Sequence, residues 1–504
     1  MNFKIKKEKI YNILLFVCIF IVLSAAILIR PLNNLDELWN YNNAINISKG
    51  KLPYKDFNMV SAPLLPIISG VILKLFSNEL IVMRIIAIIL NTTIIFLVYK
   101  IFKILKIKKS IIFLSLIWIY QLYFDYFCID YNFAVLCIAL LNLYIELKNL
   151  NTSDNIFNVK NQLLIGVLVG ASILLKQTTG LFLSVIFIFY KLLIVRRKEQ
   201  LKIVSKIIIM RMIGVLIPVI LLIIYLIANN ILLDFLDYAI YGIKTFNNKI
   251  SYINLLKNSE IQIKLLSIIV PITIIYCFYI SVKQELKTIQ QKNIYILSAY
   301  SIGCFIVVYP ISDTIHFLIG SMPAIITLIY IFFLKLKKIK IQEKELNLIK
   351  KYLRYFSELV VATIMILAII LIAKYIYNNN KFSNLKHFSF VISTIDNQVN
   401  EIDEYILEQN SKGKKVYILD ATACLYMIPI DKYNKNYDMF LKGNLGAQGE
   451  EGQIKKLENE ENVIVLILNE KFKYNWQTPE NVRRHIIENW NKTEEILIFD
   501  IYEK

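Results

Sequence analysis

The first three quarters of the chain alternate between long apolar segments and short polar ones. Stretches such as 13–29, 85–98 and 359–373 contain no charged residue. A helix needs about 20 apolar residues to cross the hydrocarbon core of a bilayer. The pattern therefore predicts a mainly α protein, built as a polytopic transmembrane helical bundle of about eleven spans. The predicted spans lie near 11–30, 80–101, 110–124, 131–147, 161–176, 178–195, 207–228, 261–282, 293–310, 317–334 and 356–377.

The apolar stretch 60–76 is shorter than these segments and contains Pro63 and Pro66. We interpret it as a helix at the membrane interface, because counting it as a span would place a basic cluster outside. With eleven spans, every large basic cluster faces the cytoplasm, as positively charged loops do. A first loop at 31–79 and the C-terminus are then external. The basic clusters lie at 103–109, 196–198, 283–292 and 335–351.

The sequence changes character after about residue 380. Short apolar runs at 416–419, 463–468 and 496–499 alternate with charged segments that favour helix. Runs of this length between polar segments are typical of strands. We therefore predict a transmembrane domain over residues 1–377 and a small extracytoplasmic α/β domain over residues 380–504.

Composition agrees with a membrane protein. Of the 504 residues, 57% are hydrophobic and only 19% are charged, with a mean hydropathy of +0.55. A soluble protein of this length needs more charge to cover its surface. The net charge of the chain is +19, and residues 1–377 alone carry +23; this excess lies in the short loops between apolar segments, where it orients the chain in the lipid bilayer. No nucleic acid partner is needed to explain it, and the six cysteines show no metal-binding or redox spacing.

Ionisable residues in or beside the predicted spans cluster at their external ends. Such residues are costly in a membrane and usually face a cavity or a partner. A transporter would place some of them near the midplane and would show repeated halves, and we see neither feature. Ionisable residues that gather on one side of the membrane favour an enzyme over a transporter. The residues concerned are Asp36, Glu37, Lys55, Asp56, Arg84, Asp125, Asp130, Lys176, Asp313 and His316.

Several motifs occur in an order that resembles a known family. An acidic pair in the first external loop is followed by Pro63-Leu64, Phe76-Ser77-Asn78-Glu79, Met83-Arg84, Ile129-Asp130-Tyr131-Asn132 and Gly170-Ala171-Ser172-Ile173-Leu174-Leu175-Lys176. Over about residues 10–335 the chain resembles the polytopic glycosyltransferases of the C-type fold. That family includes the protein O-mannosyltransferases and the bacterial aminoarabinose transferases.

The resemblance implies transfer of a sugar from a polyprenyl-phosphate-sugar donor, with inversion, on the extracytoplasmic face of the cell membrane. The acceptor would be a cell-envelope lipid, glycan or protein. No cofactor is expected; dependence on a divalent metal stays open, although the sequence shows no complete set of metal ligands. Two alternatives stay open: a polymerase or ligase for lipid-linked oligosaccharide with a diphosphate carrier, and a transporter or flippase.

Acidic residues are the candidates for acceptor chemistry. The resemblance equates Asp36 with a first-loop acid that acts on the acceptor, where a carboxylate can take a proton from the attacking hydroxyl. Glu37 would then point to a partner cation or a metal, and Asp130 would be a second acid that shapes the pocket. The structural alternatives are an acidic helix N-terminus and a helix cap. Tyr54 and Asp56 lie in a Pro-containing loop where a substrate would enter.

Basic residues at external helix ends are the candidates for the donor phosphate. Lys176, Arg84 and His316 would stabilise the charge that the phosphate gains as the sugar leaves. Asp313 would orient His316 from one helical turn away, and Gln177 would contact substrate beside Lys176. The structural alternatives are a lysine that extends to the interface, an arginine that anchors a helix, and a structural histidine.

Overall fold

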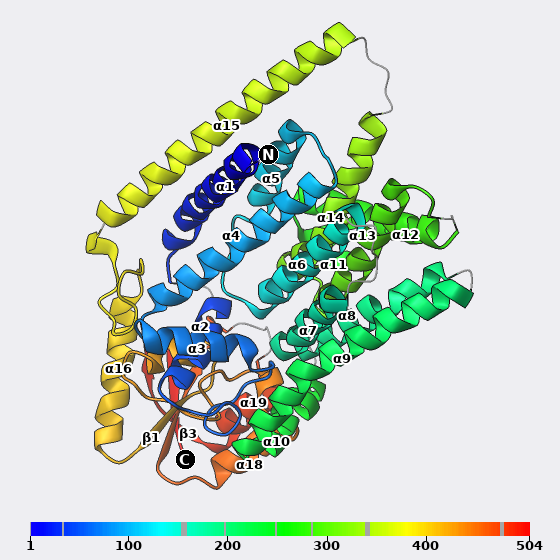
Figure 1. Ribbon diagram of the computed structural model, residues 1–504. Helices are drawn as coiled ribbons and strands as arrows, with labels where there is room; N and C mark the ends of the chain where they lie inside the picture. Colours follow the sequence, from blue (N-terminus) through cyan, green and yellow to red (C-terminus); the bar gives the residue numbers. More distant parts are fainter. Residues whose placement is uncertain are drawn as a thin grey trace. The chain divides into compact units, whose positions relative to one another are not determined.

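The protein forms two compact units in a computed structural model that describes residues 2–32, 35–152, 159–195, 198–246, 249–283, 286–337, 343–377, 379–473 and 478–504 (Figure 1). The helical unit comprises Met1–Ile27, Ala87–Leu221 and Lys249–Lys374. The α/β unit comprises Leu28–Ile86, Leu222–Asn248 and Tyr375–Lys504. The predicted external loop 31–79 therefore belongs to the same compact unit as the C-terminal residues. Asn34, in the first-loop motif, lies outside the described residues.

Long apolar helices make up the helical unit. The unit boundaries fall near the end of α1 and within α4, α9 and α15. The elements are α1 (Asn2–Leu28), α4 (Leu80–Ile104), α5 (Lys109–Tyr123), α6 (Tyr131–Thr152), α7 (Val159–Leu175), α8 (Gln177–Phe189), η1 (Tyr190–Ile194), α9 (Lys198–Ala228), α11 (Ile253–Asn258), α12 (Ile261–Lys283), α13 (Ile289–Phe305), η4 (Ile306–Val308), α14 (Thr314–Leu336) and α15 (Glu343–Tyr377).

Each predicted span coincides with one of these helices. Eight helices among the described residues are long and apolar enough to cross a membrane, and α5, α7 and α8 are shorter apolar helices. The stretch predicted at the interface forms α3 (Leu64–Leu75), whose 12 residues extend about 18 Å at 1.5 Å per residue. That length is too short for a hydrocarbon core of about 30 Å. The interfacial position of α3 remains a prediction.

Glycines bring α7 and α9 into close contact. A Cβ atom at Gly166 would lie 2.3 Å from the Arg211 carbonyl oxygen, and one at Gly214 would lie 2.5 Å from that of Leu163. A Cβ atom at Gly170 would lie 2.5 Å from Pro218. Small residues let membrane helices approach in this way, since lipid supplies no hydrophobic force between helices.

Contacts within the helical unit pair helix ends as the predicted topology requires. At the predicted cytoplasmic ends, Lys103 pairs with Glu8 at 2.6 Å, and Asn151 donates to Asn293 at 3.0 Å. At the predicted external ends, Lys176 donates to Asn132 at 2.7 Å. Which end faces the cytoplasm remains a prediction. Residues 196–197 and 338–342 of the basic clusters, and 284–285, lie outside the described residues.

The α/β unit contains a four-stranded sheet in the order β1-β2-β4-β3. β1 and β2 are parallel, while β4 is antiparallel to both β2 and β3. The elements are α2 (Leu35–Ser48), α3, α10 (Leu232–Phe235), η2 (Leu236–Tyr241), η3 (Gly242–Thr245), η5 (Asn379–Lys381), α16 (Asp396–Ser411), β1 (Lys415–Ile418), α17 (Ala423–Met427), η6 (Lys442–Asn444), α18 (Gly449–Glu458), β2 (Val463–Leu468), α19 (Glu480–Asn489), β3 (Asn491–Ile496) and β4 (Phe499–Glu503).

Two of the three predicted strands are present, and the third prediction is wrong. The runs 416–419 and 463–468 form β1 and the fully buried β2. The run 496–499 is instead the turn between β3 and β4, where Ile496 pairs with Phe499. The run forms no strand of its own, because Ile496 ends β3 and Phe499 begins β4, and β3 itself is an exposed edge strand with charged side chains. Edge strands commonly carry such charges.

Segments far apart in the sequence share the core of the α/β unit. Tyr54, Phe57 and Met59 pack with a group of residues from 226–239. The indole Nε1 of Trp39 in α2 donates to the Ala421 carbonyl oxygen at 2.7 Å. These contacts fix α2, which carries the predicted acidic pair, to the C-terminal part of the chain.

Candidate active site

Asp130 caps the N-terminus of α6. Its Oδ1 accepts a hydrogen bond from the Asn132 backbone N–H at 2.7 Å, and its carbonyl accepts one from Ala134 at 3.1 Å. The residue is only 3% exposed. The cap that the sequence left as an alternative is therefore present. Capping leaves part of the carboxylate for other work.

Lys176 connects α7 to α8 in an extended backbone conformation. Its Nζ donates to the Asn132 Oδ1 at 2.7 Å and lies 5.1 Å from the centre of the Tyr131 ring. Asn132 thus joins Asp130 and Lys176, since its backbone contacts one and its side chain the other. Gln177, predicted to bind substrate, begins α8 and is largely buried.

His316 lies in the first turn of α14, which Asp313 caps. The Asp313 Oδ1 lies 2.8 Å from both the backbone nitrogen and the Nδ1 of His316. The predicted geometry, with Asp313 orienting the ring from one turn away, is therefore present. Both side chains are half-buried. We call Asp130, Asn132, Lys176, Asp313 and His316 the Asp130 cluster.

Electrostatics link the members of the Asp130 cluster. Burial raises the pKa of the Asp130 carboxyl above its usual value, and the charge of Lys176, the hydrogen bonds of Asn132 and the charge of His316 act in the opposite direction. Lys176 and His316 thus both lie within electrostatic range of Asp130. A lysine and an imidazole beside a buried acid suit a site for an anion.

Glu37 and Arg84 form a buried ion pair within the α/β unit. The Arg84 Nε and Nη2 donate to the two carboxylate oxygens of Glu37, each at 2.9 Å. Arg84 also donates to the Arg30 carbonyl oxygen at 2.8 Å and is 0% exposed. Glu37 therefore points to a partner cation, one of the two alternatives from the sequence. The guanidinium of Arg84 anchors the connection before α2, so we do not include it in the proposed phosphate site.

Asp36 lies in the first turn of α2 beside Glu37 and is half-buried. Adjacent helical residues point about 100° apart, so the Glu37–Arg84 pair directs Asp36 elsewhere. Asp56 is exposed, and its carboxylate accepts from the Leu52 backbone N–H at 2.7 Å. Tyr54 is fully buried in the core and donates to the Ser61 carbonyl oxygen at 2.7 Å. A substrate could not reach it, so Tyr54 is left out of the proposal.

Sequence reasoning missed a second charged cluster in the helical unit. The Glu146 carboxylate in α6 contacts Arg211 of α9 at 2.7 Å and Lys191 of η1 at 3.1 Å. Arg211 also donates to Gln162 at 2.8 Å. The expectation of charges at one set of helix ends was therefore incomplete: Glu146 is 16 residues beyond Asp130, about 24 Å along α6. The charges of Glu146, Lys191 and Arg211 are paired with one another, which is how buried charges are stabilised within a helix bundle.

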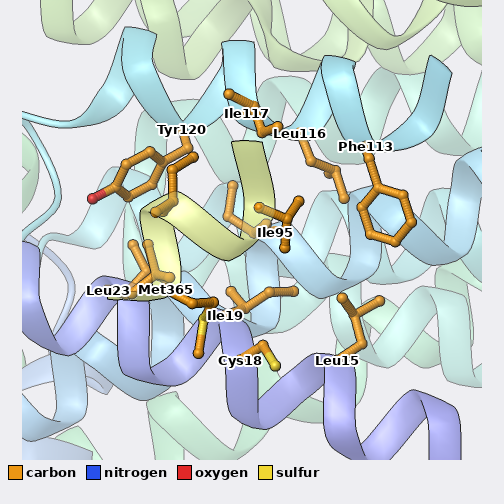
Figure 2. Close-up of a pocket in the computed structure, with 13 residues that line it drawn as sticks. Leu15, Cys18, Ile19, Leu23, Ile95, Phe113, Leu116, Ile117, Tyr120 and Met365 are labelled. Atoms are coloured by element: carbon orange, nitrogen blue, oxygen red, sulfur yellow. The ribbon is translucent and has the colours of Figure 1, made fainter. Parts of the chain in front are cut away.

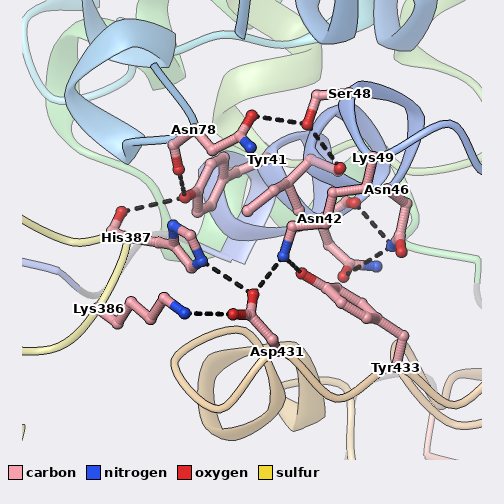
Figure 3. A network of polar contacts seen from close by, with 11 residues as sticks. Tyr41, Asn42, Asn46, Ser48, Lys49, Asn78, Lys386, His387, Asp431 and Tyr433 are labelled. Carbon is pink, nitrogen blue, oxygen red and sulfur yellow. Dashed lines mark hydrogen bonds and ion pairs between the residues drawn. The ribbon is translucent and has the colours of Figure 1, made fainter. Parts of the chain in front are cut away.

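A cation cluster in the α/β unit was also missed (Figure 3). Lys49 and Lys386 both pair with Asp431, and His387 Nε2 lies 2.9 Å from the same carboxylate. Lys49 also donates to the Tyr433 hydroxyl. Burial would raise the pKa of Asp431, but the hydrogen bonds of Lys386, Lys49 and His387 outweigh it and hold that pKa well below its usual range. No periodic sequence signal connects these residues, which come from three separate segments.

Among the described residues, no three His, Cys, Asp or Glu side chains gather in a metal-binding arrangement. The sequence matches no known family model and no curated protein.

Solved structures do resemble the chain. ArnT from Cupriavidus metallidurans bound to undecaprenyl phosphate matches with a TM-score of 0.53 and 9% identity, covering 98% of this chain and 97% of ArnT. The apo state of ArnT gives 0.52 at 9% identity, covering 98% of each chain. Archaeal oligosaccharyltransferase AglB from Archaeoglobus fulgidus, in complex with an inhibitory peptide and a dolichol-phosphate, gives 0.51 at 11% identity over 92% and 70%. The chain is thus a multi-pass membrane protein with the C-type glycosyltransferase fold.

Proposed function

We propose that this protein is a membrane glycosyltransferase that transfers a sugar from a polyprenyl-phosphate carrier to a cell-envelope acceptor on the extracytoplasmic face. The observation that carries the proposal is the Asp130 cluster, in which Lys176 and His316 gather beside a buried carboxyl. The undecaprenyl phosphate in the ArnT structure and the dolichol-phosphate in the AglB structure support a lipid phosphate as the carrier.

The reaction needs a base for the acceptor and cations for the leaving phosphate. An acceptor hydroxyl loses its proton to a carboxylate as its oxygen bonds to the anomeric carbon. The bond from that carbon to the phosphate oxygen breaks on the opposite side, which inverts the configuration. The electron pair stays on the phosphate, so polyprenyl phosphate leaves with added negative charge, and fixed cations stabilise this state most.

The residues divide between these roles. Lys176 and His316 would bind the phosphate, and Asp313 would orient the imidazole through its 2.8 Å contact. Asp130 would act as a positioning residue, because it holds Asn132, which in turn holds Lys176. Asp36 is the proposed base, since its neighbour Glu37 is committed to Arg84. Asp56 and Gln177 remain candidates for substrate contacts.

Purified full-length protein in detergent tests the proposal. It would be incubated with envelope extract and a panel of polyprenyl-phosphate pentoses, hexoses and aminosugars, and released polyprenyl phosphate would be measured by mass spectrometry. We expect release with at least one donor and loss of release in Lys176→Ala. A folded protein that releases lipid phosphate from no donor would contradict the proposal.

A second candidate is an oligosaccharide ligase, which the likeness to AglB favours. Its donor would carry a diphosphate, so a polyprenyl-diphosphate oligosaccharide belongs in the same panel. Release of lipid diphosphate alone would favour this alternative. A flippase would instead move the lipid across vesicles without cleaving it.

A further inference from the structure

An apolar groove lies among α1, α4, α5 and α15 in the helical unit (Figure 2). It contains about 610 Å³ of space that is partly open to the surroundings. Cys18 and Ile19 of α1, Phe113 and Tyr120 of α5, and Met365 of α15 face it. Its lining carries no charged side chain. Such a groove in a membrane protein suits a hydrocarbon chain.

The groove adjoins a second space with a different character. Phe113 and Val361 line both spaces, so the two are contiguous. The second space contains about 1260 Å³ and is lined by Lys108, Lys109 and Arg354, among others. It lies at the beginning of α5 and in the first half of α15. The apolar groove thus opens into this second space, which we call the basic pocket.

The basic pocket has an excess of positive charge. Arg354 is paired with Glu358 at 2.8 Å, which balances one charge. Lys108 and Lys109 are exposed, and among the described residues Glu358 is the only acidic one that lines the pocket. Lys109 also begins α5, where the partial positive charge of a helix N-terminus adds to that of the side chains. The pocket therefore suits an anion at the end of an apolar chain.

The dimensions identify the class of lipid. Along α5 the groove and the basic pocket together run from Lys109 to Tyr120, which is 11 residues, or about 16 Å at 1.5 Å per residue. Half of a hydrocarbon core of about 30 Å is about 15 Å. The groove and the basic pocket together therefore match one acyl chain with its phosphate in one leaflet, whereas the much longer polyprenyl chain of the proposed donor would extend beyond them.

We propose that the groove and basic pocket bind an anionic glycerophospholipid. One acyl chain lies along Ile19, Phe113, Tyr120 and Met365, and the phosphate contacts Lys108 and Lys109. The lipid joins α15 to the rest of the helical unit. On α15 the acyl chain contacts Val361, Ile364 and Met365, which line the groove. Since these lysines lie on the predicted cytoplasmic side, the anionic lipids of that leaflet would supply the ligand.

A photoreactive lipid tests the proposal. The full-length protein would be placed in phosphatidylcholine nanodiscs with a small fraction of phosphatidylglycerol that carries a diazirine on its acyl chain. We expect cross-links on α1, α5 and α15 that unlabelled phosphatidylglycerol suppresses and phosphatidylcholine does not. The double variant Lys108→Gln, Lys109→Gln should label on the order of tenfold less, because each of these two lysines contributes to anionic lipid binding.

A matched control separates the site from general surface charge. Lys202→Gln with Lys206→Gln removes two exposed charges from α9, also on the predicted cytoplasmic side, and should label like the wild type. Equal loss in both variants would overturn the proposal, as would equal labelling by a phosphatidylcholine probe with the same tail. Stronger competition by polyprenyl phosphate than by phosphatidylglycerol would assign the groove to the carrier lipid instead. Ile19→Trp, which fills the groove, should lower labelling with both lysines intact.

Discussion

At the scale of single residues, the clearest result is how Asn132 joins two candidates from the sequence. Asp130 and Lys176 were singled out by their places at helix ends, and both interact with this one side chain or its backbone. The motif Ile129-Asp130-Tyr131-Asn132 does not by itself indicate a role for Asn132, because an amide beside a helix start usually serves as a cap. Its structural position makes it the support of the proposed phosphate site.

The first prediction concerns Lys176. Lys176→Ala should lower kcat on the order of a hundredfold to a thousandfold, the effect of losing one group that stabilises transition-state charge. Donor affinity should change much less, because the phosphate gains charge only as the bond breaks. Single-turnover kinetics and donor binding would be compared in the purified variant. Lys257→Ala, on exposed α11 in the same unit, is the control. Normal turnover in Lys176→Ala would contradict a role in phosphate binding and would favour the alternative that Lys176 only extends to the membrane interface.

The second prediction concerns Asp36. If it is the base, Asp36→Asn should reduce turnover by about a hundredfold, the usual effect of losing general-base assistance. Donor binding should be nearly unchanged. Asp56→Asn is a useful comparison, since the Asp56 carboxylate is exposed and accepts a hydrogen bond from its own loop. A fully active Asp36→Asn enzyme would remove Asp36 from the mechanism.

At the scale of elements, the Glu37–Arg84 pair fixes α2 to the beginning of α4. Removing one partner of a buried ion pair leaves an uncompensated charge, which costs about 3–5 kcal/mol. The third prediction is that Glu37→Leu or Arg84→Leu alone lowers the thermal unfolding temperature strongly, whereas the double variant recovers much of the loss. Arg84→Lys should also destabilise, because an ammonium cannot reproduce the two parallel contacts at 2.9 Å. Single variants as stable as the wild type would contradict a structural role for the pair.

The fourth prediction concerns Asp403 in α16, where burial raises the carboxyl pKa to about 8. Between about pH 4 and pH 8 the unfolded chain loses this proton while the folded chain retains it. The free energy of unfolding should therefore fall as the pH rises, by up to about 1.4 kcal/mol per pH unit. Asp403→Asn should remove this slope, so its advantage over the wild type should grow from pH 5 to pH 8. Thermal unfolding of both proteins between pH 5 and pH 8 measures this difference. If the stability of the two proteins changed with pH in the same way, the raised pKa of Asp403 would be contradicted.

The elements also show what the sequence could predict. All eleven predicted spans coincide with helices, because a long uncharged run has few other stable forms in a membrane. The pairing of His316 with Asp313 followed from helical spacing. The pairing of Glu146 with Arg211 did not, because it depends on which helix faces which. The strand at 491–496 was missed because its exposed, charged residues carry no apolar signal.

At the scale of the whole molecule, the predicted topology and the helix-end contacts can be compared. Lys103 with Glu8, and Asn151 with Asn293, join ends that the topology assigns to the cytoplasm. Ser259 and Thr314, 3.5 Å apart, join ends that it assigns to the outside. The contacts establish which ends meet, whereas the orientation in the membrane rests on the basic loops.

The last prediction fixes that orientation. Lys412 follows α16 and is exposed, so Lys412→Cys would present a reactive thiol on the C-terminal part of the chain. If residues 380–504 are external, a membrane-impermeant thiol reagent should label this variant in intact cells as fully as after lysis. The native protein is the background control, because Cys424 is completely buried. A cysteine at Lys106, in a predicted cytoplasmic loop, should be labelled only after lysis. The reverse result at both positions would invert the topology and would move the Asp130 cluster, with its proposed chemistry, to the cytoplasmic face.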